Sequence, residues 1–185
     1  MIGYGICASF CTHRNSLEVL RHLTEKFNVV PFVSPNVMET DTRFGKAEDF
    51  IKEVREICGN DVISTIKDAE PFGPAKPLEC MVISPCTGNT LAKLACGITD
   101  TAVTMASKAH LRSGGRLVIA LATNDAMSSN LQNIATLLNK KNVFFVPMKQ
   151  DDPVMKPSSL VADFSLVEKS IEYALDSLQM RPLFL

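Results

Sequence analysis

Short apolar runs alternate along the chain with longer segments in which apolar residues recur at helical spacing. The runs predict five strands, at residues 2–8, 29–33, 80–83, 117–121 and 143–146. Apolar residues three or four positions apart predict helices, at residues 15–27, 50–57, 91–98, 102–111, 131–138 and 166–178. Strands that are apolar throughout and separated by helices are typical of a parallel sheet covered on both faces. The pattern predicts a three-layer α/β fold, Rossmann-like or flavodoxin-like, in a single domain over residues 1–185.

Several residues predict where these elements begin and end. Asn15 or Ser16 is expected to cap the first helix, and Gly59 can close the second in the left-handed conformation. The segment 70–77 holds three prolines and a glycine and is predicted to be a loop. Pro85 is expected to end the third strand, because proline cannot donate a hydrogen bond to a ladder.

Composition and charge disfavour several classes of protein. The 185 residues carry a formal net charge of −1 with no long basic or acidic run, so neither nucleic acid nor a membrane surface is expected as partner. No apolar run approaches the roughly 20 residues of a membrane-spanning helix, and the N-terminus lacks the basic region of a signal peptide. Six cysteines without a CxxC pair, beside three histidines, predict reduced thiols in a cytoplasmic protein and no metal site.

In an open parallel sheet, ligands bind beyond the carboxyl ends of the strands. This rule directs attention to four loops, at residues 8–13, 34–36, 84–90 and 122–129. The first loop leads into a helix N-terminus, where free N–H groups and the helix dipole favour an anion. Ser9 and Thr12 add hydroxyl donors there. From this loop alone, a phosphate cradle and an ordinary capped helix are equally supported.

The loop at residues 84–90 is rich in small residues, so a planar ligand can approach its backbone. Asn89 and Thr90 open the next helix and can bind a heterocycle edge or a phosphate, although Asn89 taken alone is better explained as a helix cap. Gly3, Gly5 and Ala8 formally match a dinucleotide-binding fingerprint. Both glycines fall early in the strand, however, and the second strand ends in Ser34 instead of an acidic residue. NAD(P) binding is therefore disfavoured.

The stretch 85–100 resembles the Pro-Ala-Ser-Ala-Asn-Thr motif and the following Lys-x-Ala-x-Gly-x-x-Asp of the homo-oligomeric flavin-containing cysteine decarboxylases. Matching positions are Pro85, Thr87, Asn89, Thr90, Lys93, Ala95, Gly97 and Asp100, with Cys86 and Gly88 in place of alanines. The resemblance implies that this loop contacts FMN, that the first loop and Ser34 hold its phosphate, and that the chain forms trimers or dodecamers. Those decarboxylases carry a catalytic histidine shortly before the third strand. Residues 61–79 contain none, which disfavours cysteine decarboxylation.

Within this superfamily the chain is similar, almost end to end, to the B-subunit family of dipicolinate synthases. The similarity is carried by polar loop strings that core packing does not dictate: 42–45, 69–74, 87–89, 123–126, 150–153 and 156–159. It implies oxidation of a dihydrodipicolinate-type precursor to dipicolinic acid during endospore formation, in the mother cell, with an NAD(P)-dependent, dehydrogenase-like A subunit as partner. The expected cofactor-binding residues are Ser9, Thr12, Ser34, Pro85, Cys86, Thr87, Gly88, Asn89, Thr90, Thr123 and Asn124.

A dicarboxylate substrate requires cationic donors, for which arginine is best suited. Arg43, Lys149 and Lys156 lie in predicted loops and are the candidates, although each could be ordinary surface charge. His13 could exchange protons near neutral pH or serve the fold alone. Two other functions remain open: an FMN-dependent decarboxylase, and a non-catalytic scaffold for the A subunit.

Overall fold

The computed structural model describes residues 1–75 and 77–185. The strands are β1 (Ile2–Ile6), β2 (Val29–Val33), β3 (Cys80–Cys86), β4 (Leu117–Thr123), β5 (Val143–Phe145), β6 (Met148–Lys149) and β7 (Leu160–Ala162). The α-helices are α1 (His13–Lys26), α2 (Pro35–Glu39), α3 (Ala47–Cys58), α4 (Ile66–Ala69), α5 (Gly88–Cys96), α6 (Ala102–Arg112), α7 (Leu131–Leu138) and α8 (Val167–Leu175). Two 3₁₀ turns, η1 (Phe10–Thr12) and η2 (Phe164–Leu166), precede α1 and α8.

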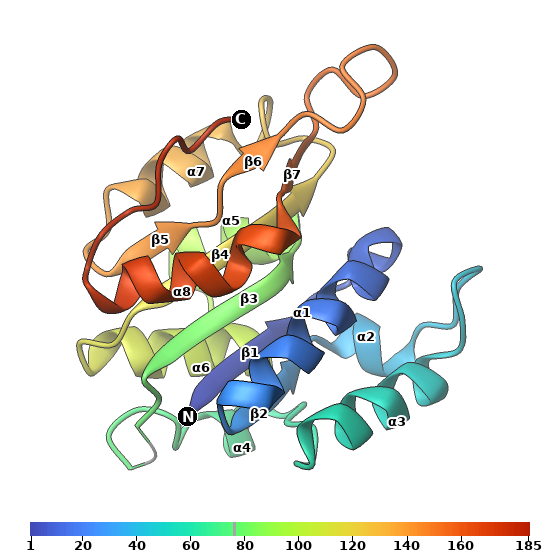
Figure 1. Cartoon of the computed structure of the whole chain (residues 1–185), viewed down its shortest axis with the longest axis vertical. Coiled ribbons are helices and arrows are strands. Elements are labelled where there is room, and N and C mark those ends of the chain that lie inside the picture. Colours follow the sequence, from blue (N-terminus) through green and yellow to red (C-terminus); the bar gives the residue numbers. More distant parts are fainter. Residues whose placement is uncertain (76) are drawn as a thin grey trace.

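The sheet has a parallel centre and an antiparallel extension (Figure 1). Strands β2, β1, β3 and β4 lie side by side in that order and run parallel, and β5 pairs in parallel with the first half of β4. Strand β7 pairs antiparallel with the end of β4, and β6 pairs antiparallel with β7. The order β2-β1-β3-β4-β5 is the flavodoxin-like one, whose switch point for ligand binding lies between β1 and β3. The predicted fold class is confirmed.

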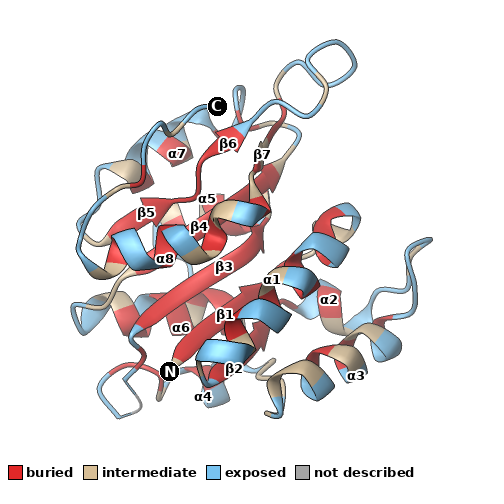
Figure 2. Ribbon diagram, in the orientation of Figure 1, coloured by how far each residue is buried: buried red, intermediate tan, exposed pale blue. Residues whose placement is uncertain are grey.

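Helices cover both faces of the sheet, so the molecule has two apolar cores. Ile2, Tyr4 and Ile6 of β1 pack with α1, α3 and α8 on one face. The alternate residues Gly3 and Gly5 face the core beneath α4 to α7, and a Cβ on Gly5 would lie 2.9 Å from the Val103 side chain of α6. Figure 2 shows the central strands buried throughout. The two glycines that match a dinucleotide fingerprint therefore allow close helix–sheet packing.

Two predicted boundaries were wrong. Helix α1 begins at His13, ahead of Asn15 and Ser16. Ser16 is buried, and its hydroxyl donates to the Ser84 carbonyl over 2.6 Å, so it joins α1 to β3 instead of capping the helix. Pro85 lies inside β3, where the pairing with β4 shifts register between Ile83 and Cys86 and thus accommodates the missing donor. Gly59 does close α3, with φ at +61°.

Four short elements were missed: α2, α4, β6 and β7 have two to five residues each, too few to show a periodicity. The loop predicted at 70–77 forms turns over residues 71–75, and Lys76 lies outside the described residues. Between β6 and β7 the chain makes a projecting loop, at the upper right of Figure 1. The tip of this loop carries Val154 and Met155, which are 86% and 79% exposed.

Candidate functional site

A cavity of about 640 Å³ opens beyond the carboxyl ends of β1, β3 and β4. Most of its wall comes from residues 8–12, 43–44, 122–124 and Thr87, and the remainder comes from Asp151, Lys156 and Val161. Its size is within the usual range of about 300–1,000 Å³ for small-molecule sites. It also lies at the switch point of the sheet, where a flavodoxin-like fold binds its ligand. We refer to it below as the switch-point cavity.

The structure brings together several of the residues that the sequence selected. Five expected cofactor-binding residues line the switch-point cavity: Ser9, Thr12, Thr87, Thr123 and Asn124. Two of the candidate cations, Arg43 and Lys156, line it as well. These residues come from segments far apart in the sequence, so their convergence on one cavity supports the choice of loops.

Other expected residues do not line the cavity. Ser34, Pro85, Cys86, Gly88 and Thr90 are buried, and Asn89 is exposed in the first turn of α5. The cap of α5 is not Asn89: the Thr87 hydroxyl accepts the Thr90 N–H over 3.3 Å. Burial raises the pKa of the Cys86 thiol well above its ordinary value, so this cysteine remains protonated and unreactive.

One wall of the cavity is suited to an anion. The Thr12 and His13 N–H groups already donate to the Ser9 and Phe10 carbonyls. The dipole of α1, whose N-terminus lies at this wall, still favours negative charge there. Thr12 donates its hydroxyl hydrogen to the Ser9 carbonyl over 2.8 Å, whereas the Ser9 hydroxyl makes no hydrogen bond within the described part of the chain. The Ser34 hydroxyl, at the end of the neighbouring strand β2, is buried and unpaired among the described residues. Buried hydroxyls are normally hydrogen-bonded, so Ser34 lacks its usual partner, but it does not line the cavity. The half-buried Ser9 hydroxyl is the one placed to bind a ligand oxygen there.

The three candidate cations differ in their surroundings. Lys156 pairs with Asp151 over 2.8 Å; this contact raises the pKa of the lysine and lowers that of the aspartate. The Arg43 guanidinium lies over the Phe44 ring, 4.9 Å from its centroid, and has no acidic partner among the described residues. Lys149, in β6, lies 3.8 Å from Asp163 and does not line the cavity. Arg43 is thus the cation with an uncompensated charge.

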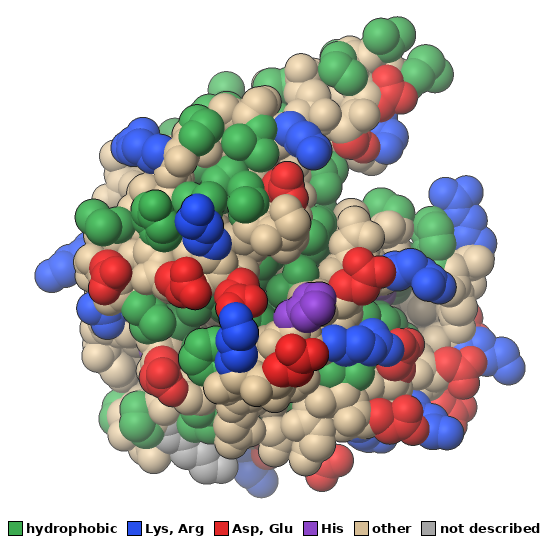
Figure 3. Space-filling view, viewed as in Figure 1, with side chains coloured by type: hydrophobic (Ala, Val, Ile, Leu, Met, Phe, Trp, Pro, Cys, Tyr) green, Lys and Arg blue, Asp and Glu red, His purple; other side chains and the backbone are tan. Residues whose placement is uncertain are grey.

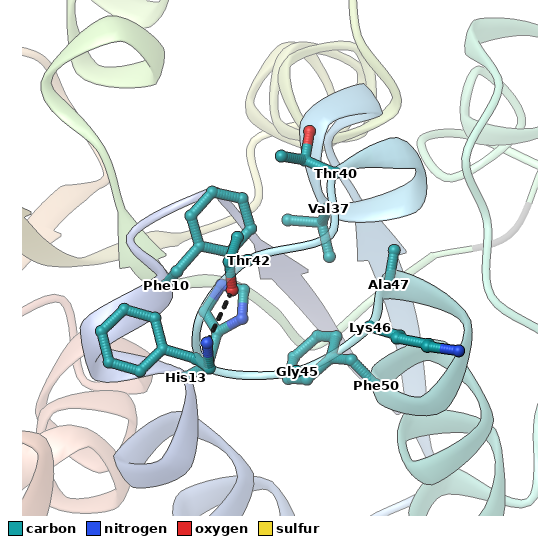
Figure 4. Close-up of a pocket in the computed structure, with 10 residues that line it drawn as sticks. Phe10, His13, Val37, Thr40, Thr42, Gly45, Lys46, Ala47 and Phe50 are labelled. Carbon is teal, nitrogen blue, oxygen red and sulfur yellow. Dashed lines mark hydrogen bonds between the residues drawn. The ribbon is translucent and has the colours of Figure 1, made fainter.

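His13 lies beside a separate, small pocket of about 50 Å³ (Figure 4). Its ring stacks on Phe50 with centroids 4.4 Å apart, and its Nε2 donates to the Cys7 carbonyl over 2.9 Å. Burial lowers the pKa of His13 below its ordinary value, so the ring is neutral at neutral pH. This geometry anchors the end of β1 to α1 and keeps the ring outside the switch-point cavity.

Some contributors to the site were missed. Asp151 and Phe44 occur in the polar strings 150–153 and 42–45, but their contacts with Lys156 and Arg43 depend on how the loops fold. Val161 was missed because β7 was not predicted.

Among residues 1–75 and 77–185, no three His, Cys, Asp or Glu side chains are grouped so as to hold a metal ion. In the same part of the chain, no helix has the length and hydropathy needed to cross a membrane. Acidic and basic side chains are interspersed over the face shown in Figure 3.

Comparison with known proteins places this geometry in context. The model of the family described as Flavoprotein matches residues 5–169. The B subunit of dipicolinate synthase from Bacillus subtilis (strain 168) is 42% identical over 183 residues, covering 98% of this chain and 92% of the relative. The crystal structure of the dipicolinate synthase B subunit from Bacillus halodurans C is similar over 100% of this chain and 95% of that one, with a TM-score of 0.91 and 40% identity. The FMN-dependent cysteine decarboxylase SpaF shares the fold, with a TM-score of 0.68 and 21% identity over 94% of this chain and 95% of that one.

Proposed function

This chain belongs to the flavoprotein family, and from that premise we propose that it is the B-type subunit of a dipicolinate synthase and binds FMN in the switch-point cavity. One structural observation carries the proposal: residues selected from separate loops converge on a cavity at the switch point of a flavodoxin-like sheet. The near full-length similarity to the B subunits of dipicolinate synthases supports the assignment to such an enzyme complex.

The residues present fit FMN. The free Ser9 hydroxyl and the start of α1 favour a phosphate at one wall of the cavity. Thr87, Thr123 and Asn124 supply polar atoms on the β3 and β4 side for the edge of a planar ring. Bound there, FMN would supply the redox chemistry.

The chain's own residues would bind and orient the substrate. A cyclic dicarboxylate of the dihydrodipicolinate type needs a cation for each carboxylate, and Arg43 offers a planar, bidentate donor at the cavity wall. Lys156 can bind a second carboxylate only in competition with Asp151. The Phe44 ring lies 4.9 Å from the Arg43 guanidinium, and this cation–π contact can hold the arginine at the cavity wall.

In this proposal the product is dipicolinic acid, made in the mother cell cytoplasm during endospore formation. The partner is an A subunit that resembles an NAD(P)-dependent dehydrogenase, and copies of this chain assemble as trimers or dodecamers. Cysteine decarboxylation is not proposed, because residues 61–79 lack the histidine that the decarboxylases carry there.

The test is dipicolinate formation from a dihydrodipicolinate precursor by this chain alone, by the A-type subunit alone, and by both together. We expect synthesis by the mixture and little or none by this chain alone. A mixture that is no faster than the A-type subunit alone would contradict a catalytic contribution by this chain. Carbon dioxide release from a cysteinyl substrate would contradict the assigned reaction.

A further inference from the structure

Four polar side chains form a directed hydrogen-bond chain at the end of β4, which we call the Asp125 cluster: Thr123, Asp125, Asn130 and Asn133. The Thr123 hydroxyl donates to one carboxylate oxygen of Asp125 over 2.5 Å. The Asn130 side-chain amide donates to the other oxygen over 2.9 Å, and the Asn133 side-chain amide donates to Asn130 Oδ1, also over 2.9 Å. Thr123 and Asn130 therefore both donate to Asp125, and Asn133 in turn holds Asn130.

Asp125 fixes the direction of the Thr123 hydroxyl. An ionised carboxylate accepts hydrogen bonds and donates none, whereas a hydroxyl has a single hydrogen and two lone pairs. The hydrogen of Thr123 is committed to Asp125, so its oxygen retains only lone pairs for other partners. Thr123 lines the switch-point cavity, and its hydroxyl can therefore serve a ligand there only as an acceptor.

Close packing against α5 holds the cluster in place. A Cβ built on Gly88, the first residue of α5, would lie 2.5 Å from Asn130 Nδ2, 2.6 Å from Thr123 Oγ1 and 2.8 Å from Asp125 Oδ1. Only glycine leaves room for all three atoms. The Asp125 carboxylate thus lies beside the N-terminus of α5, where the helix dipole stabilises negative charge.

The opposite wall of the cavity offers hydrogen-bond donors instead of an acceptor. Ser9 follows β1 and Thr123 ends β4, and β3 lies between these strands, so the two walls are separated by roughly 10 Å at normal strand spacing. The Ser9 wall offers the free hydroxyl and the Arg43 guanidinium, both of which donate, beside the start of α1. A ligand meets donors on one side of the cavity and a fixed acceptor on the other.

We propose that Asp125 is a positioning residue that orients the cavity's ligand: it holds Thr123 as an acceptor for an N–H on a heterocycle edge, while phosphate or carboxylate groups bind at the Ser9 and Arg43 wall. The inference rests on the proposed function for the identity of the ligand. The oxidised isoalloxazine ring of FMN carries one N–H, the imide at N3. In this proposal that N–H donates a hydrogen bond to the Thr123 hydroxyl oxygen.

The experiment compares the dissociation constants of FMN and N3-methyl-FMN, in which the imide hydrogen is replaced. For the unmodified protein we expect a preference for FMN of at least about fivefold, the size of one hydrogen bond between uncharged groups. Thr123→Val should abolish this preference, and Asp125→Ala should reduce it because the hydroxyl is no longer held. Thr123→Ser should retain it. Ser128→Ala is the matched control, since the Ser128 hydroxyl donates to the Asp125 backbone carbonyl in the same turn without contacting Thr123.

A preference that persists unchanged in Thr123→Val and Asp125→Ala would overturn the inference, because it would reflect only steric exclusion of the methyl group. Equal loss of affinity for both flavins would also overturn it, since a purely structural role lowers both alike. If the unmodified protein binds neither flavin, the proposed function is overturned and this inference with it. Circular dichroism of each variant checks that it remains folded.

Discussion

The Lys156 ammonium lies 2.8 Å from the Asp151 carboxylate, and both side chains line the switch-point cavity. The charge of this lysine is therefore largely compensated before any ligand arrives. Arg43 lines the same cavity and meets only the Phe44 ring among the described residues. We therefore expect the two cations to make different contributions to binding a carboxylate, which single substitutions can separate.

Arg43→Ala should lower kcat/KM of the mixed complex for the dicarboxylate by roughly 10- to 100-fold, because a hydrogen bond to a charged group contributes about 1.5–3 kcal/mol. Lys156→Ala should have a smaller effect, since it also frees Asp151. Arg181→Ala is the control, because Arg181 lies at a different surface cavity. Unchanged turnover and substrate affinity in Arg43→Ala would rule out the carboxylate-binding role of Arg43.

Gly88→Ala should lower the melting temperature and the free energy of unfolding by about 1–3 kcal/mol, the usual cost of overpacking. The added Cβ would meet three polar atoms of the Asp125 cluster at 2.5–2.8 Å. Asn89→Ala, at the next and exposed position, should melt close to the unmodified protein. A Gly88→Ala protein as stable as the original would show that the cluster can move away from α5.

The strands and longer helices could be predicted because their apolar periodicity reflects burial, as Ile2, Tyr4 and Ile6 of β1 illustrate. Boundaries were harder to predict where a polar residue serves tertiary structure. Ser16 has the residue type of a helix cap, yet it binds β3 across the core. Pro85 remains within its strand because a register shift, invisible in the sequence, compensates for its missing N–H.

The loops of the site could be predicted from topology, because carboxyl ends of parallel strands meet at one edge of the sheet. The roles of individual residues within these loops could not be predicted from the sequence. Asn89 and Thr87 are both polar residues at the start of α5, and only the fold shows that Thr87 caps the helix while Asn89 is exposed to solvent. The Asp125 cluster was missed because its partners meet only once the turn after β4 has formed.

Stability should fall as the pH drops from about 7 to 5. Burial lowers the pKa of His13 in the folded chain, so the unfolded chain binds the proton first and is favoured as the pH falls through the ordinary histidine range. His13→Phe keeps an aromatic ring against Phe50, and its free energy of unfolding should fall less between pH 7 and 5 than that of the unmodified protein. Part of the fall should persist in this variant, because burial also lowers the pKa of His110. His22→Gln, at an exposed site, is the control. Urea unfolding at several pH values gives the comparison, and identical profiles for the original protein and His13→Phe would contradict the assignment.

Multi-angle light scattering at micromolar concentration should give a mass of three, or a multiple of three, times the 20.2 kDa of one chain. This expectation follows from the resemblance to trimeric and dodecameric flavoproteins. A strict monomer at this concentration would contradict the proposed assembly.

The most direct test of the central claim is a titration of the purified chain with FMN, followed by visible absorbance, flavin fluorescence and the melting temperature. We predict saturable, noncovalent binding of one FMN per chain. At a free FMN concentration 100 times the dissociation constant, this should stabilise the fold by about 2.7 kcal/mol. A Ser9→Trp variant, in which a large ring replaces a half-buried side chain of the cavity wall, should remain folded and lose this binding. Saturating FMN that neither binds nor raises the melting temperature of the unmodified protein would contradict the account.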